Sequence, residues 1–313
     1  MIYLVLVLWI TTAVFILIEK KMIRLILWLG ISSMIAAWAF LLLGSPDVAM
    51  AEASISAFTT VFFIVCFERY FDLRKTPDYA IAKAKERDEC LFKRLIFPLL
   101  FSLFLCGLFL YYLPNDYFNT YLKELYLERF TTDVGGLNAV TSIYLGYRVY
   151  DTLFEALMLV VAVVAVIHVS HFSETSVKEG KRSEMEHSKM ATFLLRLAAP
   201  LIVLFGIYLI VHGAITAGGG FQGGLALAGF FICRYMIYGI YDAPIERVGK
   251  MEELVFIAIT ILAILIVFQG AIQYLTTGLF QDIYLLAMNT LVGLKVACSF
   301  IILFYRYVAI ERK

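Results

Sequence analysis

The chain has 313 residues, of which 62% are hydrophobic and 16% are charged, with a formal net charge of +1 and a mean hydropathy of +0.87. Soluble domains carry about 25% charged residues, so this chain lacks the side chains that cover a water-facing surface. The composition excludes an ordinary soluble enzyme and gives no support for a nucleic-acid partner. It predicts an all-α protein that crosses a membrane many times.

Nine apolar runs reach the roughly 17–25 residues that a helix needs to cross a bilayer. In chain order they are residues 2–18, 22–43, 48–67, 95–113, 153–169, 193–212, 221–241, 254–275 and 283–307. Lysine and arginine accumulate on the cytoplasmic side of membrane proteins. Here they are abundant after every second run and sparse elsewhere, which predicts an outer N-terminus and a cytoplasmic C-terminus.

Two charged stretches, residues 76–92 and 171–189, are predicted to be cytoplasmic linkers. They divide the chain into a three-helix module at 1–75, a two-helix module at 93–170 and a four-helix module at 190–313. No sequence repeat relates the three modules, which disfavours a self-contained carrier built from inverted repeats.

The third apolar run carries acids that point to ion transport. Asp47 lies in its first turn, where it either interacts with the helix dipole or takes part in transport. Glu52 lies deeper, and Ser56 and Thr59 follow it at i+4 and i+7, so the three form a polar stripe on one helix face. We interpret the stripe as part of an ion pathway. The alternative is a carboxylate that snorkels or bonds to a neighbouring helix.

The fifth and ninth runs also contain charges. Asp151 and Glu155 share a helix face at i, i+4, and like charges this close favour protonation of one of them, which suits a proton relay. Asp151 could instead cap its helix. Lys295 lies near the middle of the last run, where a charge costs about 2.5–3.5 kcal/mol on insertion scales, and Ser299 lies one turn further on. It is predicted to be a switchable cation on the pathway or one half of a static ion pair.

A glycine-rich run opens the seventh apolar segment. It contains GxGxxG, but no strand precedes it, so a dinucleotide site is disfavoured. Its two overlaid GxxxG spacings predict close helix packing, and the alternative is a broken helix end that faces a polar cavity at the outer mouth. The residues of this outer-mouth and packing motif are His212, Gly218, Gly219, Gly220, Gln222, Gly223 and Gly224.

The sequence shows no grouping that suits a resident cofactor. Five cysteines are scattered without a CxxC spacing, and no Cys or His cluster fits a zinc or iron–sulfur site. No nucleophile–base set or phosphate loop is visible. We therefore expect no cofactor and no metal in this chain, which is not an enzyme by itself.

Three motifs together resemble subunits of one family of membrane complexes. The segment Leu-Gly-Ser-Pro-Asp-Val-Ala at 43–49, with Glu52, resembles the module near the C-terminus of the large A subunit of Mrp-type sodium/proton antiporters, which is the D subunit of membrane-bound hydrogenases. Residues 138–155 resemble the hydrogenase E subunit. Residues 204–224, with Gly-Leu-Lys-Val-Ala at 293–297, resemble the Mrp B subunit (MnhB family), which is the hydrogenase F subunit.

The resemblance implies a fused D–E–F-like subunit of a complex that transports Na⁺, H⁺ or both across a prokaryotic cytoplasmic membrane. Its implied partners are the lipid bilayer, large antiporter-like subunits, small Mrp C/E/F/G-like subunits and, in a hydrogenase-type complex, peripheral hydrogenase or oxidoreductase subunits. We expect a membrane-bound hydrogenase or a related ferredoxin-linked oxidoreductase. The alternatives are a subunit of a stand-alone Mrp antiporter and a structural adaptor in such a complex.

Overall fold

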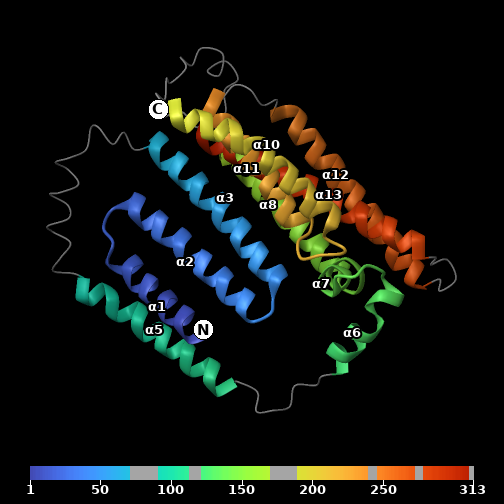
Figure 1. The fold of residues 1–313 in the computed structure, drawn as a ribbon, viewed down its shortest axis with the longest axis horizontal. Helices are drawn as coiled ribbons and strands as arrows, with labels where there is room; N and C mark the ends of the chain where they lie inside the picture. The colour runs from blue at the N-terminus through green and yellow to red at the C-terminus, as the bar shows by residue number, and fades with distance from the viewer. Residues whose placement is uncertain (71–90, 113–120, 170–188, 239–244, 272–277, 310–313) are drawn as a thin grey trace. The chain divides into compact units, whose positions relative to one another are not determined.

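The computed structural model describes residues 1–70, 91–112, 121–169, 189–238, 245–271 and 278–309, and all regular structure in them is helical (Figure 1). The two predicted linkers, 76–92 and 171–189, lie almost wholly outside the described residues. The helices in chain order are α1 (Ile2–Ile18), α2 (Met22–Leu42), α3 (Pro46–Tyr70), α5 (Leu91–Tyr112), α6 (Tyr121–Asp133), α7 (Ala139–Ser142), the π-helical turn η2 (Ile143–Tyr147), α8 (Val149–Val169), α10 (Lys189–His212), α11 (Gly220–Tyr238), α12 (Ile245–Ala271) and α13 (Gly278–Ala309).

The chain divides into two compact units. One comprises Met1–Phe67 together with Tyr126–Lys313 and contains every predicted site residue. The other, Glu68–Leu125, contains α5, an apolar helix of 22 residues.

The first two helices of the larger unit form a tight antiparallel pair. The Trp9 indole donates a hydrogen bond of 3.0 Å to the Ser32 hydroxyl, and the rings of Phe15 and Trp28 stack with their centroids 4.8 Å apart. Helix α1 ends at Glu19, whose backbone is extended. The amide of Lys21 donates to the Glu19 carboxylate at 3.0 Å and holds the pKa of that carboxyl below its ordinary value. The turn is therefore fixed by local hydrogen bonds.

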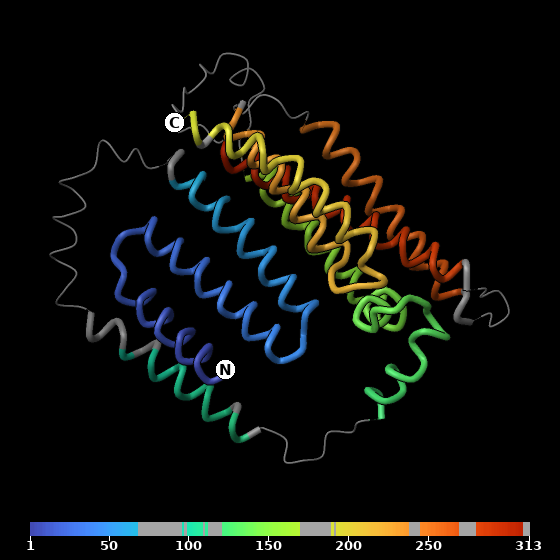
Figure 2. Tube along the Cα trace, in the orientation of Figure 1, coloured from blue at the N-terminus to red at the C-terminus, as the bar shows by residue number. Residues whose placement is uncertain are grey.

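Helix α13 forms the centre of the larger unit. In its apolar span 61% of the residues are buried within the protein, against 17–39% in the six other helices of membrane-spanning length. Helices α8, α10, α11 and α12 pack against it, and the trace in Figure 2 follows them side by side. Helix α3 reaches it through the rings of Phe58 and Phe300, whose centroids lie 5.0 Å apart. A polar residue on the inner face of α13 is therefore screened from lipid by protein.

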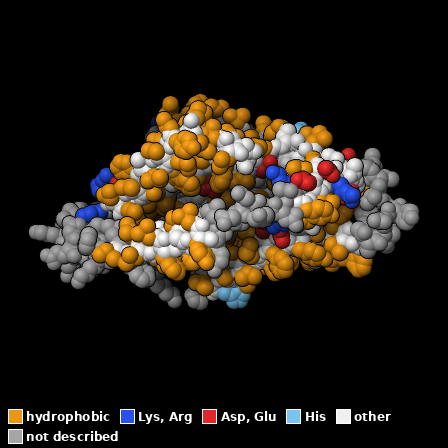
Figure 3. Space-filling view, turned by 90° about the horizontal axis from the view of Figure 1, so that it is seen from below, with side chains coloured by type: hydrophobic (Ala, Val, Ile, Leu, Met, Phe, Trp, Pro, Cys, Tyr) orange, Lys and Arg blue, Asp and Glu red, His pale blue; other side chains and the backbone are white. Residues whose placement is uncertain are grey.

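Seven helices in the described part of the chain are long and apolar enough to cross a membrane: α2, α3, α8, α10, α11, α12 and α13. Hydrophobic side chains cover much of the face seen in Figure 3, as lipid contact requires. The prediction of an all-helical, multi-pass membrane protein is confirmed. Helix α1, with 17 residues, and the apolar part of α5 are shorter, so the count of nine spans stays a prediction.

Glycines allow α11 to approach its neighbours closely. A Cβ added at Gly220 or Gly224 would clash with backbone carbonyl oxygens of α13, and one at Gly223 would lie 2.6 Å from the carbonyl oxygen of Gly206 on α10. The glycines of α11 therefore serve two interfaces: Gly220 and Gly224 lie against α13, and Gly223 lies against α10. Gly229, on the same helix, has nothing within 4 Å of an added Cβ.

We expect Gly224→Ala to destabilise the protein by about 1–3 kcal/mol, because the new methyl must push α11 away from α13. The matched control is Gly229→Ala, which should be neutral or stabilising by up to about 1 kcal/mol since alanine is the better helix former. Thermal unfolding in detergent compares the two variants. Equal melting temperatures would contradict the close packing of α11 on α13.

Candidate functional site

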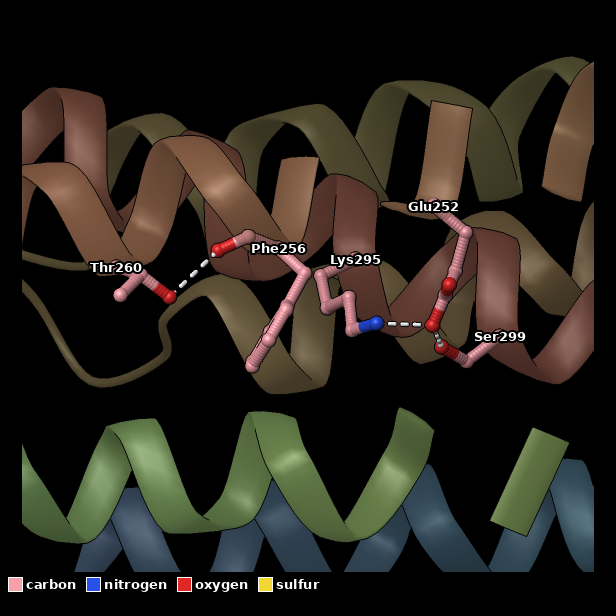
Figure 4. A network of polar contacts seen from close by, with 5 residues as sticks. All are labelled: Glu252, Phe256, Thr260, Lys295 and Ser299. Atoms are coloured by element: carbon pink, nitrogen blue, oxygen red, sulfur yellow. Dashed lines mark hydrogen bonds and ion pairs between the residues drawn. The ribbon is translucent and has the colours of Figure 1, made fainter. Parts of the chain in front are cut away.

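Lys295 lies on α13 and is almost fully buried, with 1% of its surface exposed. Its ammonium forms an ion pair with the Glu252 carboxylate on α12 (Figure 4). The Ser299 hydroxyl donates to the same carboxylate oxygen at 3.2 Å, and the Phe256 ring centre lies 5.1 Å from the lysine nitrogen. We call Lys295, Glu252 and Ser299 the central charge cluster. It places a cation and an anion in the buried interior of the bundle.

Glu252 is a member of this cluster that was not predicted from the sequence. The predicted apolar run began at residue 254, whereas α12 begins at Ile245 and carries Glu252 about two turns inside the helix. The first two turns of α12 contain charged residues that form helix well. A prediction based on the length of the apolar run therefore starts the helix too late. A signal was available: Glu252 is in phase with Val255 and Ile259, both buried on the α13 side.

A small cavity is lined by Glu155 and by Lys295 of the central charge cluster. It holds about 10 Å³ of space and lies among residues of α8, α11, α12 and α13. Its surface is almost wholly apolar, although Thr152, Glu155 and Lys295 contribute to the wall. Two of the predicted pathway residues, Glu155 and Lys295, therefore share one cavity although they lie on different helices.

Asp47 takes part in a network of hydrogen bonds that joins three distant segments. Its carboxylate accepts bonds from the side-chain amide of Asn138 at 2.8 Å and from the backbone amide of Gly218 at 3.2 Å. The Asn138 amide also donates to the carbonyl oxygens of Gly213 at 3.2 Å and Thr216 at 3.0 Å. Asp47 therefore lies in the first turn of α3 and also holds the glycine-rich loop through hydrogen bonds.

Asn138 is the second residue that sequence reasoning missed as part of the site. Its oxygen accepts from the amide of Val140 and so caps α7, and its amide bonds three oxygens from two other segments. The sequence gives no sign of these contacts, because the partners are 75 to 91 residues away. A capping asparagine before a short helix was the one local signal.

Glu52 and Ser56 face α2. The Glu52 carboxylate accepts a hydrogen bond from the Ser33 hydroxyl, and Ser56 donates to the Gly30 carbonyl oxygen at 3.1 Å. Thr59 bonds within its own helix, to the Ile55 carbonyl oxygen at 2.7 Å. The structure therefore brings two members of the predicted stripe to one interface, and no described contact joins them to the central charge cluster.

The remaining acid of the fifth run has a local partner. Asp151 pairs with Arg148, whose Nε donates to its carboxylate at 2.6 Å. In the same segment the Thr152 hydroxyl donates to the Tyr144 carbonyl oxygen at 2.7 Å. These contacts leave Glu155, one turn deeper, as the acid of this helix that lines the cavity.

The outer-mouth motif surrounds the start of α11. Gly218 and Gly219 have positive φ angles of 140° and 152°, and the amide of Gly220 donates to the Asn289 side-chain oxygen at 3.2 Å. Tyr144 donates to the same oxygen at 3.1 Å, and burial raises the pKa of Tyr144 to about 12, so this donor stays protonated at physiological pH. The loop is held by bonds that need backbone angles only glycine adopts easily.

His212 and Gln222 lie in the same region. The His212 ring stacks on Tyr208 with the centroids 4.5 Å apart, and its buried Nδ1 has no hydrogen-bond partner among the described residues. Gln222 is half-buried, with its side-chain oxygen near Gly219. In the part of the chain that the structure describes, no three His, Cys, Asp or Glu side chains gather as metal ligands would.

We expect Lys295→Met and Glu252→Met to destabilise the protein by about 3–5 kcal/mol each, because each leaves one unpaired buried charge. The double variant Lys295→Met/Glu252→Met removes both charges and should be close to the unmodified protein in stability. Thermal unfolding of the four proteins in detergent measures this. Additive losses in the double variant would show that the two side chains are not a buried pair.

We also expect Asn138→Ala to destabilise the protein by about 2 kcal/mol or more, since it removes a helix cap and leaves buried oxygens without a donor. Val140→Ala, two residues away at a half-exposed site, is the control and should change the stability by less than about 1 kcal/mol. Limited proteolysis of the loop around Gly218 provides a second measurement. Unchanged cleavage in Asn138→Ala would contradict its tethering role.

Comparison with known proteins identifies the two ends of the chain. Residues 7–71 match the MbhD family, the D subunit of MBH, and residues 190–308 match the MnhB family, "Domain related to MnhB subunit of Na+/H+ antiporter". The chain is 29% identical over 123 residues to the antiporter subunit mnhA2 of Staphylococcus saprophyticus, and 31% identical over 144 residues to an uncharacterized protein of Methanocaldococcus jannaschii. These alignments cover 39% and 42% of the chain and 14% and 53% of the relatives.

Two solved structures share its fold. One chain of the Mrp complex from Dietzia sp. DQ12-45-1b aligns with a TM-score of 0.69 and 18% identity, over 99% of this chain and 35% of that one. A chain of the archaeal membrane-bound sulfane sulfur reductase aligns with a TM-score of 0.56 and 25% identity, over 71% of this chain and 100% of that one. The chain is thus a multi-pass membrane protein in which an MbhD-like segment is followed by an MnhB-related segment, and it is similar to subunits of Mrp- and MBH-type complexes.

Proposed function

We propose that this chain is the ion-pathway subunit of a multi-subunit complex that translocates Na⁺, H⁺ or both, and that it contributes intramembrane acids and a lysine to the route. The observation that carries this proposal is the central charge cluster, in which Lys295 and Glu252 are buried on helices of membrane-spanning length. Ionisable side chains at such positions are costly and by default serve ion or proton movement.

The proposed route uses residues from two parts of the larger unit. The inner part is formed by Glu155 and Lys295, which line one cavity, and by Glu252, which pairs with Lys295. The outer part is Asp47 with Asn138 at the glycine-rich loop. The proposed route also has two branches. Glu52, Ser56 and Thr59 form a branch towards α2, and Asp151 forms a branch towards Arg148. The transported ions are the only cofactor-like species that the proposal needs.

The complex is proposed to be a membrane-bound hydrogenase or a related ferredoxin-linked oxidoreductase. Two findings favour it over a stand-alone Mrp antiporter: the match of residues 7–71 to the MbhD family, and the likeness to a chain of a respiratory reductase complex. The Mrp-like alternative rests on the mnhA2 relative and the Mrp complex. In either case the proposed partners are large antiporter-like subunits and small Mrp C/E/F/G-like subunits, with nine spans, an outer N-terminus and a cytoplasmic C-terminus.

A structural adaptor is the competing function, because a buried ion pair also fixes the register of helices. The double variant Lys295→Met/Glu252→Met separates the two, since it is expected to keep the fold. If the pair carries ions, the assembled complex should lose Na⁺-dependent transport by about 10²-fold or more, as expected when a positioned proton-transfer group is removed.

Transport is measured in inverted membrane vesicles, and assembly by blue-native electrophoresis of the same membranes. The matched control is Glu246→Gln/Lys250→Gln, which removes an exposed acid and an exposed lysine from the start of the same helix. It should leave transport unchanged. Full transport by an assembled complex with the Met pair would contradict the pathway function and support the adaptor.

A further inference from the structure

Glu155 is an exposed acid on a helix that is long and apolar enough to cross a membrane. It is the seventh residue of α8, which begins at Val149, so it lies about 9 Å along the helix from that end. Among the described residues, no cation forms an ion pair with its carboxylate, and Arg148 is already paired with Asp151. A carboxylate held against lipid at this depth is costly. The exposed side of α8 therefore requires a cover other than lipid.

The same side of α8 carries a row of large apolar side chains. Tyr150, Phe154, Met158 and Val161 are 56–65% exposed. They recur every three or four residues and so form one ridge along the helix. Such a ridge suits lipid and a neighbouring helix equally well. Glu155 lies on its flank, next to Met158 at i+3, and this acid decides what can cover the surface.

Helix α10 provides the contrast. Its exposed side includes Leu201 and Leu204, which are 62% and 65% exposed. No Asp, Glu, Lys or Arg occurs between residues 197 and 211, so this surface is typical of one that faces lipid. The exposed side of α8 is equally apolar except for the unpaired carboxylate of Glu155.

The spanning helices of this chain do not supply the missing positive charge. Helix α1 contains no Lys or Arg, and α5 contains none after residue 94. Lys295 is already paired with Glu252. A second copy of the chain would bring the same helices and the same lack of a free cation. The other Lys and Arg residues of the spanning helices lie near the helix ends opposite to the one that carries Glu155: Arg24, Arg196, Arg234, Arg247, Lys250 and Arg306.

We propose that the exposed side of α8 binds a membrane-spanning helix of a different subunit, and that this helix carries a Lys or Arg that pairs with Glu155. The ridge around Phe154 and Met158 packs against the partner helix, and the ion pair fixes its depth and register. The inference rests on the proposed function for the existence of a multi-subunit complex. It adds the surface and the charge of the partner.

Site-specific photo-cross-linking in the assembled complex tests the partner. A benzophenone amino acid replaces Met158, beside Glu155, and in a control it replaces Leu204, which has the same exposed fraction of 65%. The Met158 probe should form an adduct with a spanning helix of another subunit, with a Lys or Arg within about one turn of the labelled residue. The Leu204 probe should give a several-fold lower yield of protein adducts. An adduct of the Met158 probe with lipid alone, with a second copy of this chain, or with a helix lacking a basic residue would overturn the proposal.

A charge exchange tests the ion pair. Glu155→Lys places two cations together and should lower the amount of assembled complex by about 10-fold or more on blue-native electrophoresis. Replacing the basic residue of the cross-linked helix by Glu should restore assembly, which also shows that the variant chain folds. The matched control is Glu246→Lys, at an exposed acid at the start of α12, which should assemble normally. Normal assembly of Glu155→Lys, or no recovery in the exchanged pair, would contradict the proposed contact.

The outcomes distinguish this inference from the proposed function. If the Lys295→Met/Glu252→Met complex loses transport while the Met158 probe labels no basic helix, the pathway function stands and the docking surface fails. If the Met pair transports normally while the charge exchange restores assembly, the pathway function fails and the docking surface stands.

Discussion

The ammonium group of Lys295 must be paired with a carboxylate, because an isolated charge in an apolar bundle would cost several kcal/mol. This requirement explains features of the fold that are otherwise unrelated. Helix α12 brings Glu252 to the depth of the lysine, and α13 occupies the centre of the unit, where protein shields the pair from lipid. The glycines at the start of α11 let that helix close against α13. The bundle is built around one pair of opposite charges.

The region around the glycine-rich loop depends on a different kind of contact. There Asp47 and Asn138 hold the loop around Gly218 through hydrogen bonds, several of them to backbone groups. Such bonds fix a loop without placing a charge deep in the membrane. The result is one polar network at the glycine-rich loop and a second polar cluster at Lys295, with Tyr144 and Asn289 bonded to each other at the start of α11. The acids of the chain therefore have distinct physical settings despite their similar chemistry.

The sequence predicted helices and membrane insertion well, since apolar length is a local property of the chain. It also singled out Lys295, whose position within an apolar run is visible from the sequence alone. It missed Glu252, because the first turns of α12 are charged and the partner of a buried lysine lies on another helix. Asn138 was missed as a site residue because its partners come from segments 75 to 91 residues away. Periodicity can indicate that Glu252 faces the core, but only long-range packing decides which residues it meets there.

The proposed function requires that ionisable groups on the membrane-spanning helices, Glu155 among them, change their protonation while the complex transports ions. Infrared difference spectroscopy of the assembled complex, recorded between rest and turnover, measures this directly through the carbonyl stretch of a protonated carboxyl group. The account predicts a turnover-dependent carboxyl band that disappears in Glu155→Gln. Identical difference spectra for the unmodified complex and for Glu155→Gln would contradict it.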